Sequence, residues 1–195
     1  MSGLSEAFAL HGFAVTAPLL SEREAVALRE GVGRVFDRCS ASMGLEPWLA
    51  RVSQVRSPEL WDEAFVDLGA HAGLRAAVHE VLGAEGRVAW QHLVWRPPHC
   101  PIRLPWHADR PTWPEELRAS GGVAVWLALD ASGPDSGGLR YGPGSHRPDH
   151  EPQASVCPEV PVGAALLHHP DVLHQSGENL TGDWRRALIL VFTPR

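Results

Sequence analysis

The sequence predicts a mainly β fold, a β-sandwich or barrel with helices on its N-terminal flank. Segments with helical spacing of apolar residues all lie before about residue 85, and short strand-like segments separated by Gly and Pro turns follow. The 19 Gly and 17 Pro among 195 residues agree with a turn-rich fold. We expect a single domain over residues 1–195, with a mostly helical flank at 1–85 and a β core carrying the functional site at 86–195.

The N-terminal flank begins with an apolar segment at 12–20, which predicts a strand ending in a turn. Ser21 followed by Glu24 is the pattern of a helix N-terminal capping box, and apolar residues keep helical spacing from there to about Arg38. The pattern is irregular from 40 to 60. Two further helices are expected at 59–68 and 71–82, the second ended by Gly83.

The rest of the chain has the pattern of strands. The first expected strand, 87–96, is ended by Pro97 and Pro98. The segment 122–129 is apolar at nearly every position, as in a strand that is covered on both faces. Three more strands are expected at 139–141, 162–168 and 186–193.

Composition excludes several classes of partner. A formal net charge of −6 argues against nucleic acid and anionic membranes, because binding to phosphate requires clustered positive charge. No apolar run approaches the roughly 20 residues that span a bilayer, and no secretion signal is recognisable. Cys39, Cys100 and Cys157 lack the spacing of a metal knuckle or a disulfide framework. We therefore expect a cytoplasmic protein whose partner is a small molecule; the sequence leaves its oligomeric state open.

A His-x-Asp pair between two expected strands indicates a metal site. In a strand, His107 and Asp109 would point to the same side, and His174 is the best candidate for a third ligand. Two histidines and one carboxylate form the open coordination set of non-haem Fe(II) oxygenases. Two alternatives remain: the pair is a hydrogen-bonded surface pair, or His168 or His169 takes the third position.

Four segments together carry a resemblance to a known family. They are Pro105-Trp106-His107-Ala108-Asp109, the apolar segment 125–129, the Gly-rich segment 138–146, and the segment 174–187 that begins His-Gln-Ser-Gly. With these segments the chain, from about Gln91 to Phe192, resembles the phytanoyl-CoA dioxygenase family of Fe(II)- and 2-oxoglutarate-dependent oxygenases. The resemblance implies a double-stranded β-helix, a cupin-like jelly-roll with the metal inside its open end.

The resemblance implies a role for particular residues. His107, Asp109 and His174 match the catalytic iron ligands, and the aspartate favours oxygenation over the halogenation of related enzymes, which have a small residue there. Arg185, eleven residues after the second histidine, matches the arginine that binds the distal carboxylate of 2-oxoglutarate. Arg186 is the competing choice, because the sequence alone does not set the strand register.

Three further positions match residues that help hold the cosubstrate: Ser176, Trp126 and Gln91. Their alternative interpretations are a turn-capping serine, a core tryptophan and a strand-surface glutamine. The sequence also departs from the family pattern. Ala108 stands where many members have Gln, and the region between Asp109 and Gly122 is short. We therefore expect either an open pocket or a cover from the N-terminal helices or another subunit.

The implied reaction uses dioxygen and 2-oxoglutarate as cosubstrates, hydroxylates an unactivated C–H bond of a metabolite or natural-product intermediate, and releases succinate and carbon dioxide. Desaturation, ring formation and epimerisation are related outcomes. A small polar or anionic substrate with an apolar or ring portion is expected. Its candidate contacts at the pocket mouth are Arg103, Trp106, Arg110, Trp113, Arg140 and Tyr141. The alternatives are a cupin-like non-oxidative metal-dependent isomerase or ligand-binding protein, and a structural jelly-roll with an incidental His-x-Asp.

Overall fold

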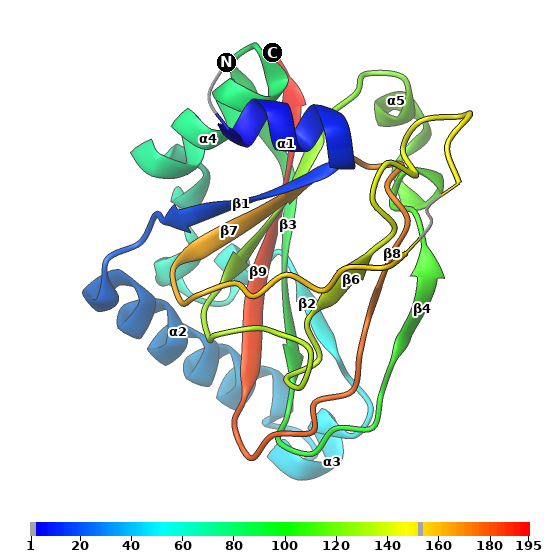
Figure 1. Ribbon diagram of the computed structural model, residues 1–195. Helices are drawn as coiled ribbons and strands as arrows, with labels where there is room; N and C mark the ends of the chain where they lie inside the picture. The colour runs from blue at the N-terminus through cyan, green and yellow to red at the C-terminus, as the bar shows by residue number, and fades with distance from the viewer. Residues whose placement is uncertain (1–2, 152–153) are drawn as a thin grey trace.

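Two antiparallel sheets face each other in the protein, a computed structural model of which describes residues 3–151 and 154–195. The larger sheet has six strands in the order β1-β7-β5-β9-β3-β2, and the smaller has three in the order β4-β8-β6 (Figure 1). The larger sheet consists of β1 Phe13–Pro18, β2 Gln54–Arg56, β3 Gly86–Arg96, β5 Val123–Ala128, β7 Ala164–His168 and β9 Arg185–Pro194. The smaller consists of β4 Leu104–His107, β6 Leu139–Tyr141 and β8 His174–Ser176. The predicted mainly β jelly-roll with N-terminal helices is confirmed.

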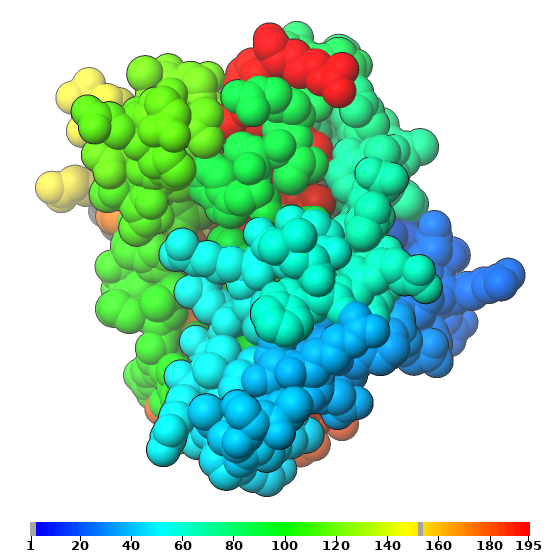
Figure 2. Space-filling model, turned by 180° about the vertical axis from the view of Figure 1, so that it is seen from behind, coloured from blue at the N-terminus to red at the C-terminus, as the bar shows by residue number. Residues whose placement is uncertain are grey.

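Helices pack on the outer face of the larger sheet, and seen from behind this face is covered largely by the N-terminal half of the chain (Figure 2). The α-helices of this half are α1 Gly3–His11, α2 Glu22–Ser40, α3 Leu45–Leu49 and α4 Ala72–Leu82, and the short 3₁₀ helices are η1 Pro58–Leu60, η2 Glu63–Phe65 and η3 Leu68–Ala70. Two short helices, η4 Arg110–Thr112 and α5 Glu115–Arg118, follow β4. Within the described ranges, no helix is both long and apolar enough to cross a membrane.

Strand alternation divides the larger sheet into an outer, helix-covered face and an inner face toward the smaller sheet. On β3, Leu93 and Trp95 belong to the core under the helices, whereas Val94 packs with the inner cluster. On β9, Leu188 and Leu190 are in the outer core, and Ala187 is in the inner cluster. The same alternation places the side chains of Arg96 and Arg185 on the inner face, at the same end of two paired strands.

Most predicted elements are confirmed. The capping box of α2 forms, since the Ser21 side chain accepts from Glu24 N–H and the Glu24 carboxylate accepts from Ser21 N–H. Gly83 ends α4 with a φ of 67°. All six residues of β5 are buried, as its continuous apolar pattern predicts.

One predicted helix is wrong, and several short elements were not predicted. The segment 59–68 forms separate 3₁₀ turns because the Asp62 carboxylate accepts from Ala64 N–H and starts a new turn, while Val66 is extended and Asp67 is left-handed. The sequence did not predict α1 or the edge strand β2, and α5 shows that helices are not confined to the first 85 residues. The segment expected as a flank therefore also supplies β1 and β2 to the larger sheet.

Candidate metal centre

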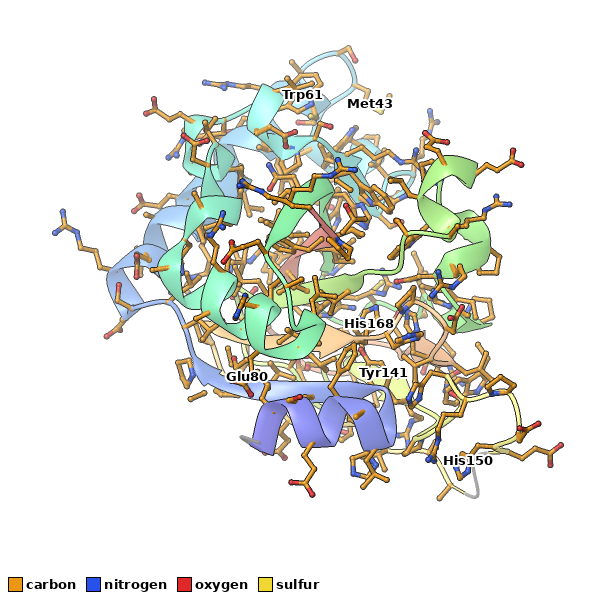
Figure 3. The ribbon with its side chains drawn as sticks, turned by 90° about the horizontal axis from the view of Figure 1, so that it is seen from above. Met43, Trp61, Glu80, Tyr141, His150 and His168 are labelled. Carbon is orange, nitrogen blue, oxygen red and sulfur yellow. The ribbon has the colours of Figure 1, made fainter. Side chains whose placement is uncertain are left out.

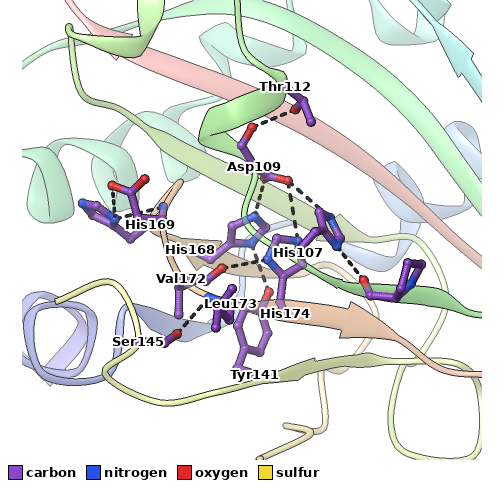
Figure 4. Close-up of polar contacts among 12 residues, drawn as sticks. His107, Asp109, Thr112, Tyr141, Ser145, His168, His169, Val172, Leu173 and His174 are labelled. Carbon is purple, nitrogen blue, oxygen red and sulfur yellow. Dashed lines mark hydrogen bonds and ion pairs between the residues drawn. The ribbon is translucent and has the colours of Figure 1, made fainter. Parts of the chain in front are cut away.

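The three residues expected as ligands come together between the two sheets (Figure 4). His107 ends β4, and its cross-strand partner in the smaller sheet is His174, the first residue of β8. Nε2 of each histidine is 3.6 Å from Oδ1 of Asp109. One ligand atom from each of the three residues lies within 4.8 Å of the others, so a single metal ion could contact all three.

Asp109 reaches this position by a different local structure from the one predicted. The strand β4 stops at His107, and Asp109 has helical dihedral angles (φ −75°, ψ −37°) as the residue that precedes η4. Its carbonyl accepts from Thr112 Oγ1 at 2.7 Å, which fixes the turn. The carboxylate therefore faces His107 because the chain turns, and the expected strand alternation does not extend to Asp109.

The two histidines present their Nε2 atoms to the site. Nδ1 of His107 lies 2.8 Å from the Pro105 carbonyl, and Nδ1 of His174 lies 3.0 Å from the Val172 carbonyl. A carbonyl only accepts, so each Nδ1 carries the proton and each Nε2 has a free lone pair for a metal. Burial, and to a lesser extent the neighbouring His168, lowers the pKa of His174 to about 4. The His174 ring is therefore in the neutral, ligating form at pH 7.

The Asp109 carboxylate is ionised, which is the form that binds a metal. Burial alone would raise the pKa of Asp109, but the neighbouring imidazoles of His107 and His168 outweigh it and hold this pKa well below its usual range. The contact with Asp109 raises the pKa of His107, with burial opposing. Two imidazoles and one carboxylate are a donor set that suits Fe(II) and leaves coordination positions open. The residues present therefore fit the metal that the resemblance implies.

A second feature of the interior is a pair of buried arginines, Arg96 on β3 and Arg185 on β9, which are 7% and 2% exposed. Arg96 donates to Ser176 Oγ at 2.8 Å, and Arg185 donates to the Gly137 carbonyl at 2.9 Å. Among the described residues neither makes an ion pair, and Nε of each is buried without a partner. Burial, followed by the charge of Arg96, lowers the pKa of Arg185 to about 9.

An unpaired buried charge is costly, and two of one sign are more so. The arginine pair could therefore receive an anion, which no side chain among residues 3–151 and 154–195 supplies. A carboxylate matches the fork geometry of guanidinium groups. The distal carboxylate of a dicarboxylic acid such as 2-oxoglutarate fits this chemistry. The position also fits, because Ser176, which contacts Arg96, lies on the same strand as His174.

The register separates the two candidate arginines. Arg186 turns to the outer side and forms a bidentate pair with Asp130, with N–O distances of 2.7 and 2.8 Å. Arg185 points inward, where its guanidinium carbon lies 5.6 Å from the ring centre of Trp126. Ser176 and Trp126 therefore both lie against the arginine pair.

Gln91 is placed away from this site, contrary to the prediction. It lies on the outer face of β3, where its amide nitrogen donates to the Glu59 carboxylate at 2.7 Å and to the Phe65 carbonyl at 3.1 Å. The reason is the alternation of β3, which directs Gln91 to the same side as Leu93. The next residue of β3, His92, faces the inner side instead.

The residues expected at the pocket mouth are dispersed. Trp106 is 44% exposed on β4, Arg103 pairs with Glu178, Arg110 pairs with Asp171, and Arg140 is half-buried near Ser155. Tyr141 and Trp113 are not at a mouth: Tyr141 is fully buried inside the barrel, and Trp113 is buried edge-to-face against Trp90. Their aromatic character predicted a surface contact, but both rings fill the interior.

Sequence reasoning missed three residues that face the inner side, Arg56, His92 and Arg96. His168, which was considered only as an alternative metal ligand, also faces inward. Arg96 could have been found, because it ends a strand directly before Pro97 and alternates with buried Trp95. Arg56 on β2 is the cross-strand partner of His92 on β3. Burial lowers the pKa of His92; the charge of Asp109 opposes this shift, and the charge of Arg56 adds to it. No sequence signal pairs Arg56 with His92, since β2 itself was not predicted.

The two histidines that could have competed with His174 have other partners. Nε2 of His168 lies 3.0 Å from Oδ2 of Asp109, the oxygen that does not face the other two histidines. His169 turns away, and its Nδ1 lies 3.6 Å from Asp171. The third position of the candidate metal centre thus belongs to His174.

Comparison with known proteins agrees with this architecture. Residues 8–187 match the phytanoyl-CoA dioxygenase (PhyH) family. Ectoine dioxygenase of Nocardia farcinica is 26% identical over 223 aligned residues, which cover 93% of this chain and 74% of that protein. The crystal structure of EctD from S. alaskensis with 2-oxoglutarate and 5-hydroxyectoine has a TM-score of 0.84 at 23% identity, covering 100% of this chain and 76% of that one. SnoK, a non-heme alpha-ketoglutarate-dependent carbocyclase from nogalamycin biosynthesis, also has a TM-score of 0.84, at 20% identity, covering 100% and 84%.

Proposed function

Because the chain belongs to the phytanoyl-CoA dioxygenase family, we propose that it is an Fe(II)- and 2-oxoglutarate-dependent oxygenase that hydroxylates an unactivated C–H bond of a small molecule, with release of succinate and carbon dioxide. The observation that carries the proposal is the buried pair Arg96 and Arg185, which has no acidic partner among the described residues and contacts the strand of His174 through Ser176.

His107, Asp109 and His174 would hold the iron, and Arg185 with Arg96 would bind the distal carboxylate of 2-oxoglutarate. When bound, the metal and the two cosubstrates supply the oxidising chemistry, including decarboxylation to succinate. The protein supplies orientation and exclusion of water. Trp126 supports the Arg185 guanidinium from within the barrel, and Ser176 supports that of Arg96.

The substrate is proposed to be a small molecule with an anionic or strongly polar group and an apolar part. Arg56 and His92 share the inner face at the β2 edge of the larger sheet, and neither side chain has a hydrogen-bond partner among the described residues. Next to them on β3 and β9, Val94 and Ile189 are only partly buried. The combination suits a molecule that carries both kinds of surface.

A non-oxidative isomerase built on the same barrel would use the metal ligands but has no need for two buried arginines. The test must therefore probe the buried arginines independently of the metal ligands. Anaerobic titration with Fe(II) and then 2-oxoglutarate is expected to produce the weak visible charge-transfer band of the chelate. The band is expected to require far more 2-oxoglutarate in Arg185→Ala and to be unchanged in Arg186→Ala, the adjacent residue that pairs with Asp130.

Absence of the band in the wild-type protein, or a full band in Arg185→Ala at the wild-type concentration of 2-oxoglutarate, would contradict the proposal. Succinate formation with a panel of small molecules then identifies the substrate class. Anionic compounds are expected to stimulate succinate release more than their neutral amides, and Arg56→Gln is expected to reduce that preference.

A further inference from the structure

We propose that His168 and Tyr141 form a hydrogen-bonded relay that positions Asp109 as a one-oxygen metal ligand, with its second oxygen held away from the metal. The inference rests on the proposed metal centre and goes beyond it, because it assigns a positioning role to two residues that are neither ligands nor cosubstrate contacts.

The relay crosses from one sheet to the other. His168 is the last residue of β7 in the larger sheet, and Asp109 follows β4 of the smaller one. Nε2 of His168 is 3.0 Å from Oδ2 of Asp109, and Nδ1 of His168 is 3.0 Å from the Tyr141 hydroxyl. Seen from above, His168 and Tyr141 lie together in the interior, far from the Met43 and Trp61 end of the molecule (Figure 3).

The two oxygens of Asp109 have different surroundings. Oδ1 is 3.6 Å from Nε2 of both His107 and His174, whereas Oδ2 has His168. An ionised carboxylate only accepts, so Nε2 of His168 carries the proton of this hydrogen bond. In the neutral ring Nδ1 is then an acceptor, and the Tyr141 hydroxyl donates to it.

Burial gives the relay a fixed geometry. His168 is 2% exposed and Tyr141 is fully buried, with its ring stacked on Phe13 at 4.4 Å between centroids. A hydroxyl and an imidazole in such surroundings would each be costly without a partner. Each satisfies the other, and the carboxylate completes the chain.

The consequence for a metal is a choice of coordination. A carboxylate can bind through one oxygen or through two, and two-oxygen binding would take a position that the oxygens of 2-oxoglutarate or dioxygen need. The hydrogen bond from His168 favours the one-oxygen form, because Oδ2 would lose its donor on turning to the metal. Partners of this kind typically change metal affinity 10–100-fold when they are removed.

Two substitutions of His168 by amide side chains separate the effect of losing the hydrogen bond from the effect of losing the imidazole ring. In His168→Gln, the amide nitrogen lies near the position of Nε2 and can still donate to Asp109. In His168→Asn, the shorter side chain reaches only toward Tyr141. Tyr141→Phe removes the hydroxyl and retains the ring that stacks on Phe13, so it tests the outer end of the relay without a cavity.

The first measurement is anaerobic titration with Co(II), followed by its visible absorption, which needs neither cosubstrate nor turnover. His168→Gln is expected to bind Co(II) within about threefold of wild type, His168→Asn about 10–100-fold more weakly, and Tyr141→Phe a few-fold more weakly. His169→Gln, which alters a neighbour paired with Asp171, is the control and is expected to bind as wild type does. Thermal melting of each apoprotein checks that the fold is retained.

The second measurement is 2-oxoglutarate affinity at saturating Fe(II), from the charge-transfer band. It is expected to fall in His168→Asn and to be retained in His168→Gln. Equal Co(II) affinity in the Asn variant and wild type, or equal losses in the Asn and Gln variants, would overturn the relay while leaving the metal centre intact. A wild-type protein that binds no Co(II) and no Fe(II) would overturn the metal centre and the relay together.

Discussion

At the scale of the residue, adjacent side chains of one strand serve different purposes. Trp95 packs under the helices, whereas Arg96 lies inside the barrel. Residue type alone predicts neither direction, because arginine is most often exposed. What sets the direction is the register of β3 against β9, in which Arg96 pairs with Arg185.

This pairing predicts the effect of removing one of the two charges. Arg96→Met is expected to weaken 2-oxoglutarate affinity by at least about tenfold, the loss of one charge-assisted hydrogen-bonded contact. Thermal stability of the apoprotein is expected to be equal or higher, because the substitution relieves repulsion between two buried cations. Isothermal titration and thermal melting measure the two effects.

The control for Arg96→Met is Arg103→Met, an exposed arginine whose partner is Glu178. It is expected to change neither affinity nor stability appreciably. A large loss of stability in Arg96→Met with unchanged 2-oxoglutarate affinity would mean that Arg96 is a structural residue.

At the scale of the element, the sequence predicted regular segments well and irregular ones poorly. The capping box at Ser21 and the terminal Gly83 are local signals, so the boundaries of α2 and α4 could be read directly. The 59–68 segment has apolar residues at helical spacing, but the Asp62 carboxylate competes for backbone N–H groups there. Its arginine partner, Arg34, lies on α2 and is distant in sequence, so the competition could not be seen.

The Arg34–Asp62 pair predicts a pH-dependent contribution of this segment to stability. Arg34 donates two hydrogen bonds to the Asp62 carboxylate, at 2.7 and 2.9 Å. The hydrogen bond from Arg34 lowers the pKa of Asp62, with burial opposing. Asp62→Asn is expected to reduce the free energy of unfolding at pH 7 by about 1 kcal/mol, a modest value because Arg34 is half-exposed.

The sign of the pH effect follows from the direction of the shift. Because the folded-state pKa is below the unfolded value of about 4, the stabilisation is present above that pH and is lost as the pH falls through the folded-state pKa. The difference between wild type and Asp62→Asn should therefore be constant from pH 7 to about 4 and should close below it, as measured by urea unfolding. Asp67→Asn, at an exposed left-handed position that Asn also tolerates, is the control. A difference that widens on acidification would contradict the assignment.

At the scale of the whole molecule, the sequence predicted what the site contains but not how the two sheets share it. His107, Asp109, His174 and Arg185 were identified from their spacing and from the resemblance. The first three side chains converge, and Arg185 is buried with an unpartnered Nε. Arg96 was not identified, and His168 was considered only as an alternative ligand, because the contacts of both residues join the larger and the smaller sheet. Such contacts join residues 80 and 59 positions apart, and no local pattern encodes them.

The division of the site between two sheets predicts that its ligands stabilise the fold as a unit. The expected metal ligands lie on the side of the smaller sheet, whereas both buried arginines are on the larger one. A metal with 2-oxoglutarate would therefore bridge the sheets and neutralise the repulsion between Arg96 and Arg185. At a free concentration one hundred times Kd, 2-oxoglutarate should add about 2.7 kcal/mol to the free energy of unfolding. For a protein of this size this corresponds to a rise in Tm of roughly 5–10 °C.

Differential scanning fluorimetry with Ni(II), which avoids reaction with dioxygen, and then with added 2-oxoglutarate measures the two increments separately. Arg185→Ala should keep the increment from Ni(II) and lose most of the increment from 2-oxoglutarate. His174→Ala should lose both Tm increments. Without a bound metal, 2-oxoglutarate would contact only the arginines and would bind weakly. If 2-oxoglutarate raised the Tm of Arg185→Ala as much as that of wild type, the dicarboxylate would not bridge the sheets through the arginine pair. Its binding would then have to be sought at the metal alone.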